Sequence, residues 1–150
     1  MRLVHYAALA VAVIPVAGGA QEFAAMPIAA GSCLAPGAWY TFSPSGPQRT
    51  EAQVLLRNVA ARQVVLLGEQ HDSAEDHAWQ LQTLAALHLL RPNLVIGFES
   101  FPRRMQPVLD RWIAGGLSQR QLLEQTEWDK VWRFSPSLYL PLFEFARLNR

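Results

Sequence analysis

The sequence predicts an α/β fold, with a parallel βαβ-type sheet flanked by helices. Two short apolar runs, residues 63–67 and 94–98, have the aliphatic and β-branched composition of buried strands. The stretch between them has the length and apolar spacing of a helix, which Pro92 stops after about Leu90. A strand, a helix and a second strand in this order form a right-handed unit with parallel strands.

Helix-start signals precede two predicted helices, one before the first strand and one between the two strands. Thr50 and Gln53 have the spacing of a capping box, and apolar residues follow at helical intervals. Asp72 and Glu75 form a second pair with the same spacing, directly after the first strand. We therefore expect one helix to begin next to Thr50 and the next one to begin at Asp72.

The back half of the chain predicts helices in succession. The first covers residues 103–114, with Pro107 near its first turn and Gly115 at its end. A short second helix opens at Ser118, because Gln121 completes a capping box.

The last helix opens at Ser135, which precedes a proline at the first helical position. Pro141 is expected to kink this helix or to shift its start, and no stop signal precedes Arg150. Two strands alone do not make a stable sheet, because both would be edges. Residues 50–150 are therefore expected to be the N-terminal part of an α/β domain that is truncated at its C-terminus, unless another chain completes the sheet.

Residues 1–20 are typical of a signal peptide, because Arg2 precedes an apolar stretch that small residues end. This stretch is too short for a comfortable membrane span, although a retained anchor is the alternative. Residues 21–49 are rich in Ala, Pro, Gly and Ser and are expected to be a flexible leader. The protein is expected to be exported, and either periplasmic or associated with the outer membrane. Lipidation of Cys33, the only cysteine, is not favoured, because no Leu lies three places upstream.

The charge distribution does not favour a polyanionic partner. The net charge is +1, and no block of like charge is present. Binding to nucleic acid is therefore not expected.

Acidic and histidine side chains follow the two predicted strands. Glu69 and His71 come after the first strand, and Glu99 ends the second. Parallel sheets bind ligands beyond the carboxyl ends of their strands, so these residues are expected to share a cleft. Such a set suits a divalent metal or acid–base catalysis. Alternatively, Glu69 only caps the next helix or pairs with Arg103 or Arg104, and His71 is a polar turn residue.

Two further histidines and a tyrosine are weaker candidates. His77 follows His71 by one and a half helical turns and could reach the mouth of the site. His88 lies among leucines and is expected at the edge of the core. The back half is rich in aromatic residues, which form either core or the wall of a pocket for a flat ligand. Among them, the phenol of Tyr139 could ligate ferric iron.

Three ordered blocks of the sequence resemble the ChaN-like haem-binding uptake proteins of the wider Tiki and erythromycin-esterase superfamily. They are "VVLLGEQHDSAEDHAWQ", "LVIGFESFPRRMQPVLDRWIAGGLS" and "WDKVWRFSPSLYLPLFEFAR", and the likeness covers about residues 39–150. It implies a bacterial iron-acquisition protein that holds haem through a tyrosine at a dimer interface. Tyr139 is the preferred ligand over Tyr40. Elsewhere in the superfamily, the residues that match Glu69, His71 and Glu99 form a hydrolytic or metal site.

These observations leave several functions open. The first is an exported haem-binding protein, in which Tyr139, His71 and His77 bind the cofactor and the partners are a second copy and outer-membrane iron-uptake machinery. The alternative is a metal-dependent or acid–base hydrolase that uses Glu69, His71 and Glu99. The last is an inert truncated product, because family domains continue with a second histidine motif that is absent here.

Overall fold

The structure is a computed structural model of the 150-residue chain, and it describes residues 2–4 and 33–150. The described residues form two compact units, one of residues 33–63 and one of residues 2–4 with 64–150. Most of the predicted signal peptide and the first part of the predicted leader, residues 5–32, lie outside the described residues.

The smaller unit contains an antiparallel hairpin and one helix. The hairpin joins β2 (Trp39–Ser43) to β3 (Gly46–Thr50), and Gly46 supplies the positive φ of 106° after its turn. The helix α1 (Ala52–Ala60) has Glu51 as its N-cap residue, without a side-chain hydrogen bond. The predicted capping box at Thr50 is therefore wrong, because Thr50 is the last residue of the β3 ladder and the N-cap of α1 is Glu51, one residue later.

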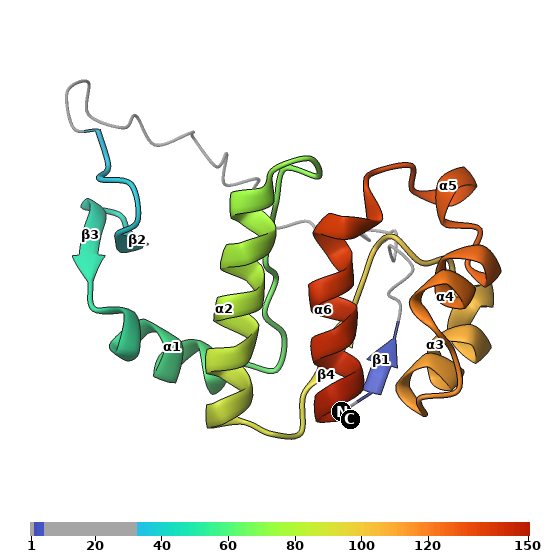
Figure 1. The fold of residues 1–150 in the computed structure, drawn as a ribbon. Coiled ribbons are helices and arrows are strands. Elements are labelled where there is room, and N and C mark those ends of the chain that lie inside the picture. Colours follow the sequence, from blue (N-terminus) through green and yellow to red (C-terminus); the bar gives the residue numbers. More distant parts are fainter. Residues whose placement is uncertain (1, 5–32) are drawn as a thin grey trace, which may run out of the picture. The chain divides into compact units, whose positions relative to one another are not determined.

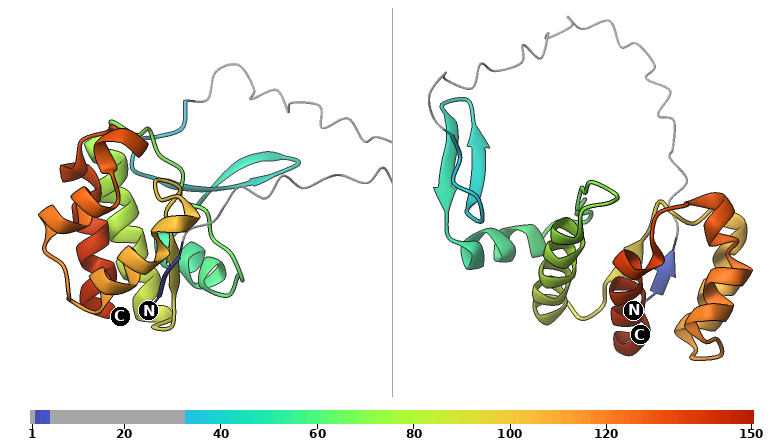
Figure 2. Two further views of the ribbon diagram at one scale, coloured as in Figure 1. Left: turned by 90° about the vertical axis from the view of Figure 1, so that its right-hand side faces the viewer. Right: turned by 45° about the horizontal axis from the view of Figure 1, so that its top comes forward.

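The larger unit is mostly helical. Its two long helices, α2 (Ala74–Leu90) and α6 (Pro136–Asn149), lie side by side and run in the same direction (Figure 1). The other elements are the strands β1 (Arg2–Val4) and β4 (Val95–Gly97), the short turn of helix η1 (Arg103–Met105), and the helices α3 (Gln106–Ile113), α4 (Gln119–Gln125) and α5 (Trp128–Val131). In Figure 1 and in the right-hand view of Figure 2, α6 lies between α2 and the group of α3, α4 and α5. No described helix is long and apolar enough to cross a membrane.

The α/β prediction is confirmed only in its coarse form, as a mixed and mostly helical fold. The expected parallel pairing of residues 63–67 with 94–98 is wrong for the described structure, in which residues 64–70 belong to no helix and join no ladder. The parallel partner of β4 is instead β1, with Leu3 opposite Ile96. The apolar run that was expected to be buried is open to solvent, since Leu66 is 89% exposed. Without a neighbouring strand, apolar composition alone does not make a β-strand.

The core of the larger unit is aromatic, and α6 provides its centre. The side chains that are almost completely buried include Leu109, Trp112, Leu122, Trp128 and Phe143. Both buried indoles also satisfy their polar edge, because Trp112 Nε1 donates to the carbonyl of Phe143 at 3.0 Å and Trp128 Nε1 donates to that of Phe134 at 2.7 Å. Most of the aromatic back half is therefore core.

The caps of the helices show which local signals were sufficient. The predicted capping box of Ser118 and Gln121 is confirmed at the start of α4. The cap of α2 is Ser73, whose Oγ accepts from the backbone of Asp76, so the prediction of Asp72 was one residue too early. The last helix begins at Pro136 after Ser135, as predicted, and Pro141 lies inside it without shifting its start.

We expect Ser118→Ala to lower the free energy of unfolding by about 1 kcal/mol, because it removes the hydroxyl that accepts from the backbone N–H of Gln121 in the capping box. Urea denaturation followed by circular dichroism measures this change. Ser135→Ala is the matched control, since Ser135 precedes α6 but makes no capping hydrogen bond with its side chain. Equal losses in the two variants would contradict the stabilising role of the capping box.

Candidate functional site

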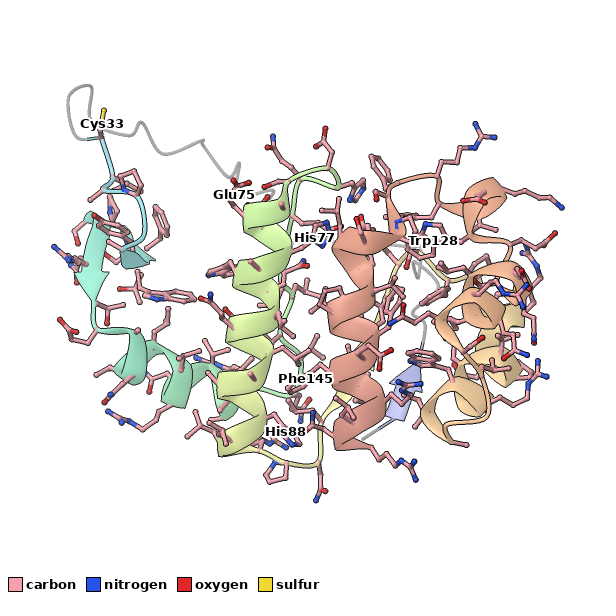
Figure 3. The ribbon with its side chains drawn as sticks, viewed as in Figure 1. Cys33, Glu75, His77, His88, Trp128 and Phe145 are labelled. Carbon is pink, nitrogen blue, oxygen red and sulfur yellow. The ribbon has the colours of Figure 1, made fainter. Side chains whose placement is uncertain are left out.

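The site forms where α2 and α6 begin. Because the two helices run side by side in the same direction, residues of their first turns meet. His77 lies near the start of α2 (Figure 3), and its ring is 4.3 Å from that of Tyr139 on α6. The segment before α2 is fixed against that helix, since Gln80 Nε2 donates to the carbonyl of Leu67 at 2.9 Å. This contact places Glu69, two residues later, next to both first turns.

The carboxylate of Glu69 is the centre of the site. His71 Nδ1 lies 2.8 Å from its Oε1, and the hydroxyl of Tyr139 donates to the same oxygen at 3.0 Å. His77 Nδ1 lies 3.1 Å from Oε2, which is within ion-pair distance but off the direction of a hydrogen bond. Only 10% of the Glu69 side chain is exposed. A nearly buried carboxylate surrounded by donors is a fixed acceptor with a defined orientation.

His71 lies between this carboxylate and solvent. Its ring packs against Trp132 at 4.7 Å and against Phe134 at 4.9 Å between centroids. Its Nδ1 faces Glu69 Oε1 at 2.8 Å, and its Nε2 is 3.7 Å from Glu99 Oε1. The imidazole is thus held in one orientation between the two carboxylates.

Glu69, His71 and Glu99 are the three residues that the sequence predicted to share a cleft, and the structure brings them together. Each offers one ligand atom, and these atoms lie within 4.8 Å of one another. Glu99 completes the set from the solvent side, since 69% of its side chain is exposed. Two carboxylate oxygens and one imidazole nitrogen are donors that suit a divalent cation. Their role as ligands stays a prediction.

The alternative roles for Glu69 do not match the geometry. The described ion pair of Arg104 is with Glu127, at 3.6 Å, and the cap of α2 is Ser73.

We call Glu69, His71, His77, Glu99 and Tyr139 together the Glu69 cluster. Within it, His77 is 4% exposed and lies behind Glu69 rather than at a mouth.

Tyr139 is the innermost member of the Glu69 cluster. It is 3% exposed, and its hydroxyl lies 3.0 Å from Glu69 Oε1 and 3.2 Å from the carbonyl of His71. Burial raises the pKa of its phenol well above the ordinary value of 10, and the neighbouring carboxylate of Glu69 raises it further. Tyr40, the other candidate tyrosine ligand, lies in the smaller unit, where its hydroxyl accepts from the backbone of Ala35.

Stability is expected to fall at alkaline pH because of Tyr139. The pKa of Tyr139 is higher in the folded state than in the unfolded state, where it is about 10. Tyr139 therefore contributes fully to the free energy of unfolding below the unfolded pKa, and this contribution is lost as the pH rises through the folded-state pKa. We expect the free energy of unfolding to decrease above about pH 10. Denaturant titrations at several pH values measure this slope, and Tyr139→Phe should reduce it. An unchanged slope in the variant would contradict the assignment.

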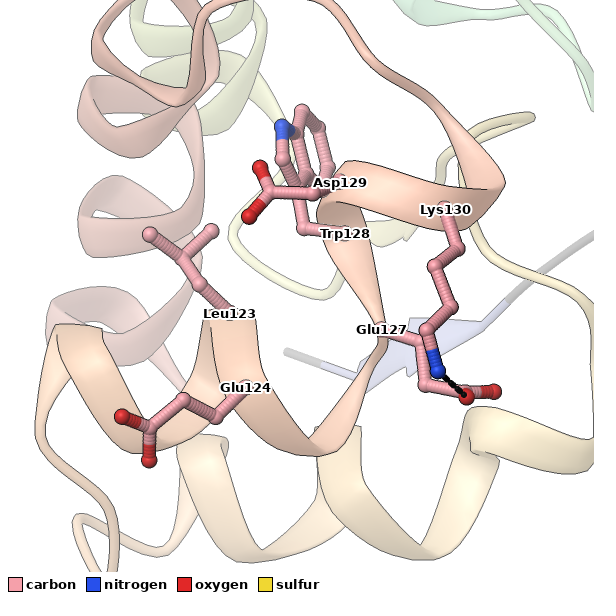
Figure 4. Close-up of a pocket in the computed structure, with 6 residues that line it drawn as sticks. All are labelled: Leu123, Glu124, Glu127, Trp128, Asp129 and Lys130. Atoms are coloured by element: carbon pink, nitrogen blue, oxygen red, sulfur yellow. Dashed lines mark hydrogen bonds and ion pairs between the residues drawn. The ribbon is translucent and has the colours of Figure 1, made fainter.

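Two other features lie outside the Glu69 cluster. His88 is at the opposite end of α2 from His77 and packs against Phe145 at 5.7 Å, as expected of a residue at the edge of the core (Figure 3). A pocket of about 160 Å³ lies at α4 and α5 (Figure 4). It is lined by Leu123, Glu124, Glu127, Trp128, Asp129 and Lys130. Sites for drug-sized ligands have about 300–1,000 Å³, so we assign no ligand to it.

The sequence did not predict that Tyr139 and Trp132 contact Glu69 and His71, because these contacts join distant segments of the chain. The hydrogen bond from Tyr139 to Glu69 and the packing of Trp132 on His71 join residues far apart in the chain. Aromatic residues at these positions fit a core equally well, so no local signal distinguishes the two roles.

Comparison with known proteins agrees with the resemblance of the motifs. The family model described as "Haem-binding uptake, Tiki superfamily, ChaN" matches residues 55–150, which include the whole Glu69 cluster. No curated protein and no solved structure matches the chain. Because the matched region covers more than half of the sequence, the chain belongs to the ChaN-type haem-binding uptake family of the Tiki superfamily.

Proposed function

We propose that this protein is an exported haem-binding protein of bacterial iron uptake. The match of the haem-binding uptake family model to residues 55–150 carries the proposal. The finer expectations, a homodimer and outer-membrane uptake machinery as partner, belong to the same proposal.

The Glu69 cluster contains residue types that bind haem iron. Haem iron is bound in proteins by side chains such as histidine and tyrosine, and both residue types are present here. Trp132 and Phe134 pack around His71 and provide apolar surface next to it. When bound, haem would supply an iron centre, and His71, Trp132 and Phe134 would hold it at this face.

Hemin titration of the full chain, followed at the Soret band, tests the proposal. We expect a saturable spectral shift, with affinity about tenfold lower in Phe134→Ala, equivalent to about 1.4 kcal/mol. Phe42→Ala is the control, because Phe42 is 70% exposed in the smaller unit and far from the motif in sequence. The absence of a saturable shift in the folded wild-type protein would refute haem binding.

A second candidate function is a metal-dependent or acid–base hydrolase. The clustering of ligand atoms from Glu69, His71 and Glu99 favours it. A divalent cation that binds this set should raise the melting temperature, since a ligand at 100 times its Kd contributes about 2.7 kcal/mol to stability. Turnover of a panel of esters and peptides, removed by a chelator, would support the hydrolase. A melting temperature that no divalent cation changes would exclude the metal-dependent form.

A further inference from the structure

We propose that Asp76 is a positioning residue, which fixes the backbone between Glu69 and His71 and so keeps the imidazole of His71 between its two carboxylates. Asp76 is not itself a member of the Glu69 cluster, and it lies in the first turn of α2. The inference rests on the second candidate function, in which Glu69, His71 and Glu99 hold a divalent cation, and it adds no ligand to that set.

The segment that carries Glu69 and His71 is not held by a sheet. Residues 64–70 join no ladder in the described structure, so no strand partner binds the backbone of Gln70. Fixing such a segment costs conformational entropy, which other contacts must offset. Because Gln70 lies between the two predicted ligands, the orientation of its backbone decides where both of their side chains point.

Both backbone groups of Gln70 bind to the start of α2. The N–H of Gln70 donates to Asp76 Oδ2 at 2.7 Å, and its carbonyl accepts from the N–H of Ser73 at 2.9 Å. Asp76 is fixed in turn, because its own N–H donates to Ser73 Oγ, the cap of the helix, at 3.2 Å. A hydrogen bond to an ionised carboxylate is stronger than one between neutral groups. These contacts close a ring that holds the peptide groups on both sides of Gln70.

The result of this ring is a fixed imidazole. The side chain of His71 is 36% exposed, so burial alone does not determine its orientation. Its Nδ1 stays 2.8 Å from Glu69 Oε1 only while the backbone between the two residues keeps its course. Of the described side chains, only that of Asp76 accepts from the N–H of Gln70. Asp76 therefore acts on the predicted ligands through the backbone, without touching the cation.

Glu75 provides a matched comparison for Asp76. It is the preceding residue, and it is also acidic and in the first turn of α2 (Figure 3). Both carboxylates interact favourably with the N-terminal end of the helix dipole. Among the described contacts, however, no hydrogen bond or ion pair joins Glu75 to the segment before the helix. An effect that occurs at Asp76 and not at Glu75 thus reports the hydrogen bond rather than the charge.

Proton nuclear magnetic resonance of the full chain, without added metal, tests the positioning role. The rings of Trp132 and Phe134 lie 4.7 Å and 4.9 Å from that of His71, so their ring currents should shift its ring-proton resonances. Asp76→Ala should move these resonances toward the positions of an unstructured histidine. Asp76→Asn keeps an acceptor oxygen and should leave them as in wild type, and so should the control Glu75→Ala.

Binding of Mn²⁺ measures the consequence for the predicted ligands, and the electron paramagnetic resonance signal of the free ion reports it. We expect Asp76→Ala to weaken binding by about tenfold, as is usual for residues that orient metal ligands. Asp76→Asn should bind as wild type although it has lost a charge. Asp76→Glu keeps the charge but displaces the carboxylate by one methylene, so it should bind as weakly as the alanine variant. Glu75→Ala should bind as wild type.

The outcomes separate this inference from the function on which it rests. His71 resonances that stay at their wild-type positions in Asp76→Ala would overturn the positioning role, whether or not Mn²⁺ binds. Equal losses of affinity in Asp76→Asn and Glu75→Ala would also overturn it, because the charge alone would then explain them. A wild-type chain that binds no Mn²⁺ would count against the cation site, while the resonances of His71 would still decide the role of Asp76. If Asp76→Ala does not fold, Asp76→Glu gives the same comparison, since it keeps an acid in the first turn of the helix.

Discussion

Replacing Trp112 by alanine is expected to lower the free energy of unfolding by about 3–5 kcal/mol, the largest loss that we expect from a single core change. The indole is 0% exposed in the centre of the larger unit, so its removal leaves a cavity. It also removes the hydrogen bond from Nε1 to the carbonyl of Phe143 and the contact with Arg147, whose guanidinium carbon lies 4.2 Å above the ring. Urea denaturation followed by circular dichroism measures the loss.

Two controls separate the parts of this effect. Trp112→Phe keeps most of the ring but removes the donor, so it should cost clearly less than the alanine variant. Trp79→Ala removes the same side chain from a position that is 36% exposed, where a smaller cavity forms. Losses of equal size at Trp79 and Trp112 would contradict the description of the core.

Helices could be predicted from the sequence because their signals are local. Pro92 marks the end of α2, and Ser118 with Gln121 opens α4, as the structure confirms. Even so, two adjacent candidates such as Asp72 and Ser73 compete for one cap, and only the backbone decides between them. Local signals therefore give the existence of a helix better than its first residue.

Strands could not be predicted in the same way, because a strand exists only with its partner. Residues 64–67 have suitable composition but join no ladder in the described structure, whereas β4 pairs with Arg2–Val4, which was interpreted as part of a signal peptide. The hairpin of β2 and β3 arises in a stretch for which no strand was expected. Both differences depend on pairing between segments, which apolar periodicity does not encode.

The part of the site that depends on residues close in sequence could be predicted, whereas the part that depends on contacts between distant segments could not. Glu69 and His71 are close in sequence, so one turn brings them together, and Glu99 joins them through the segment that follows β4. The position of Tyr139 behind Glu69 depends instead on how α2 and α6 pack. A sequence motif identifies the residues at such a site, whereas helix packing decides which of them face solvent.

Replacing Glu69 by alanine is expected to lower the free energy of unfolding by about 2–4 kcal/mol. The change removes the acceptor next to two almost completely buried polar side chains, His77 and Tyr139. Each buried polar group that loses its partner costs about 1–3 kcal/mol, although Tyr139 keeps the carbonyl of His71 within reach. Urea denaturation without added metal measures this change in the free energy of unfolding, and so the contribution of Glu69 to stability apart from any bound cation.

Glu99→Ala is the matched control, because it removes the same chemical group from the same cluster at a position that is 69% exposed. Its free energy of unfolding should change by no more than about 0.5 kcal/mol. If the cluster binds a divalent cation, however, both variants should lose the rise in melting temperature that the cation produces in wild type. Stability would then separate the two carboxylates while cation binding would not. A large loss of stability in Glu99→Ala, or none in Glu69→Ala, would contradict the assignment of Glu69 as the buried acceptor that holds His71 in place.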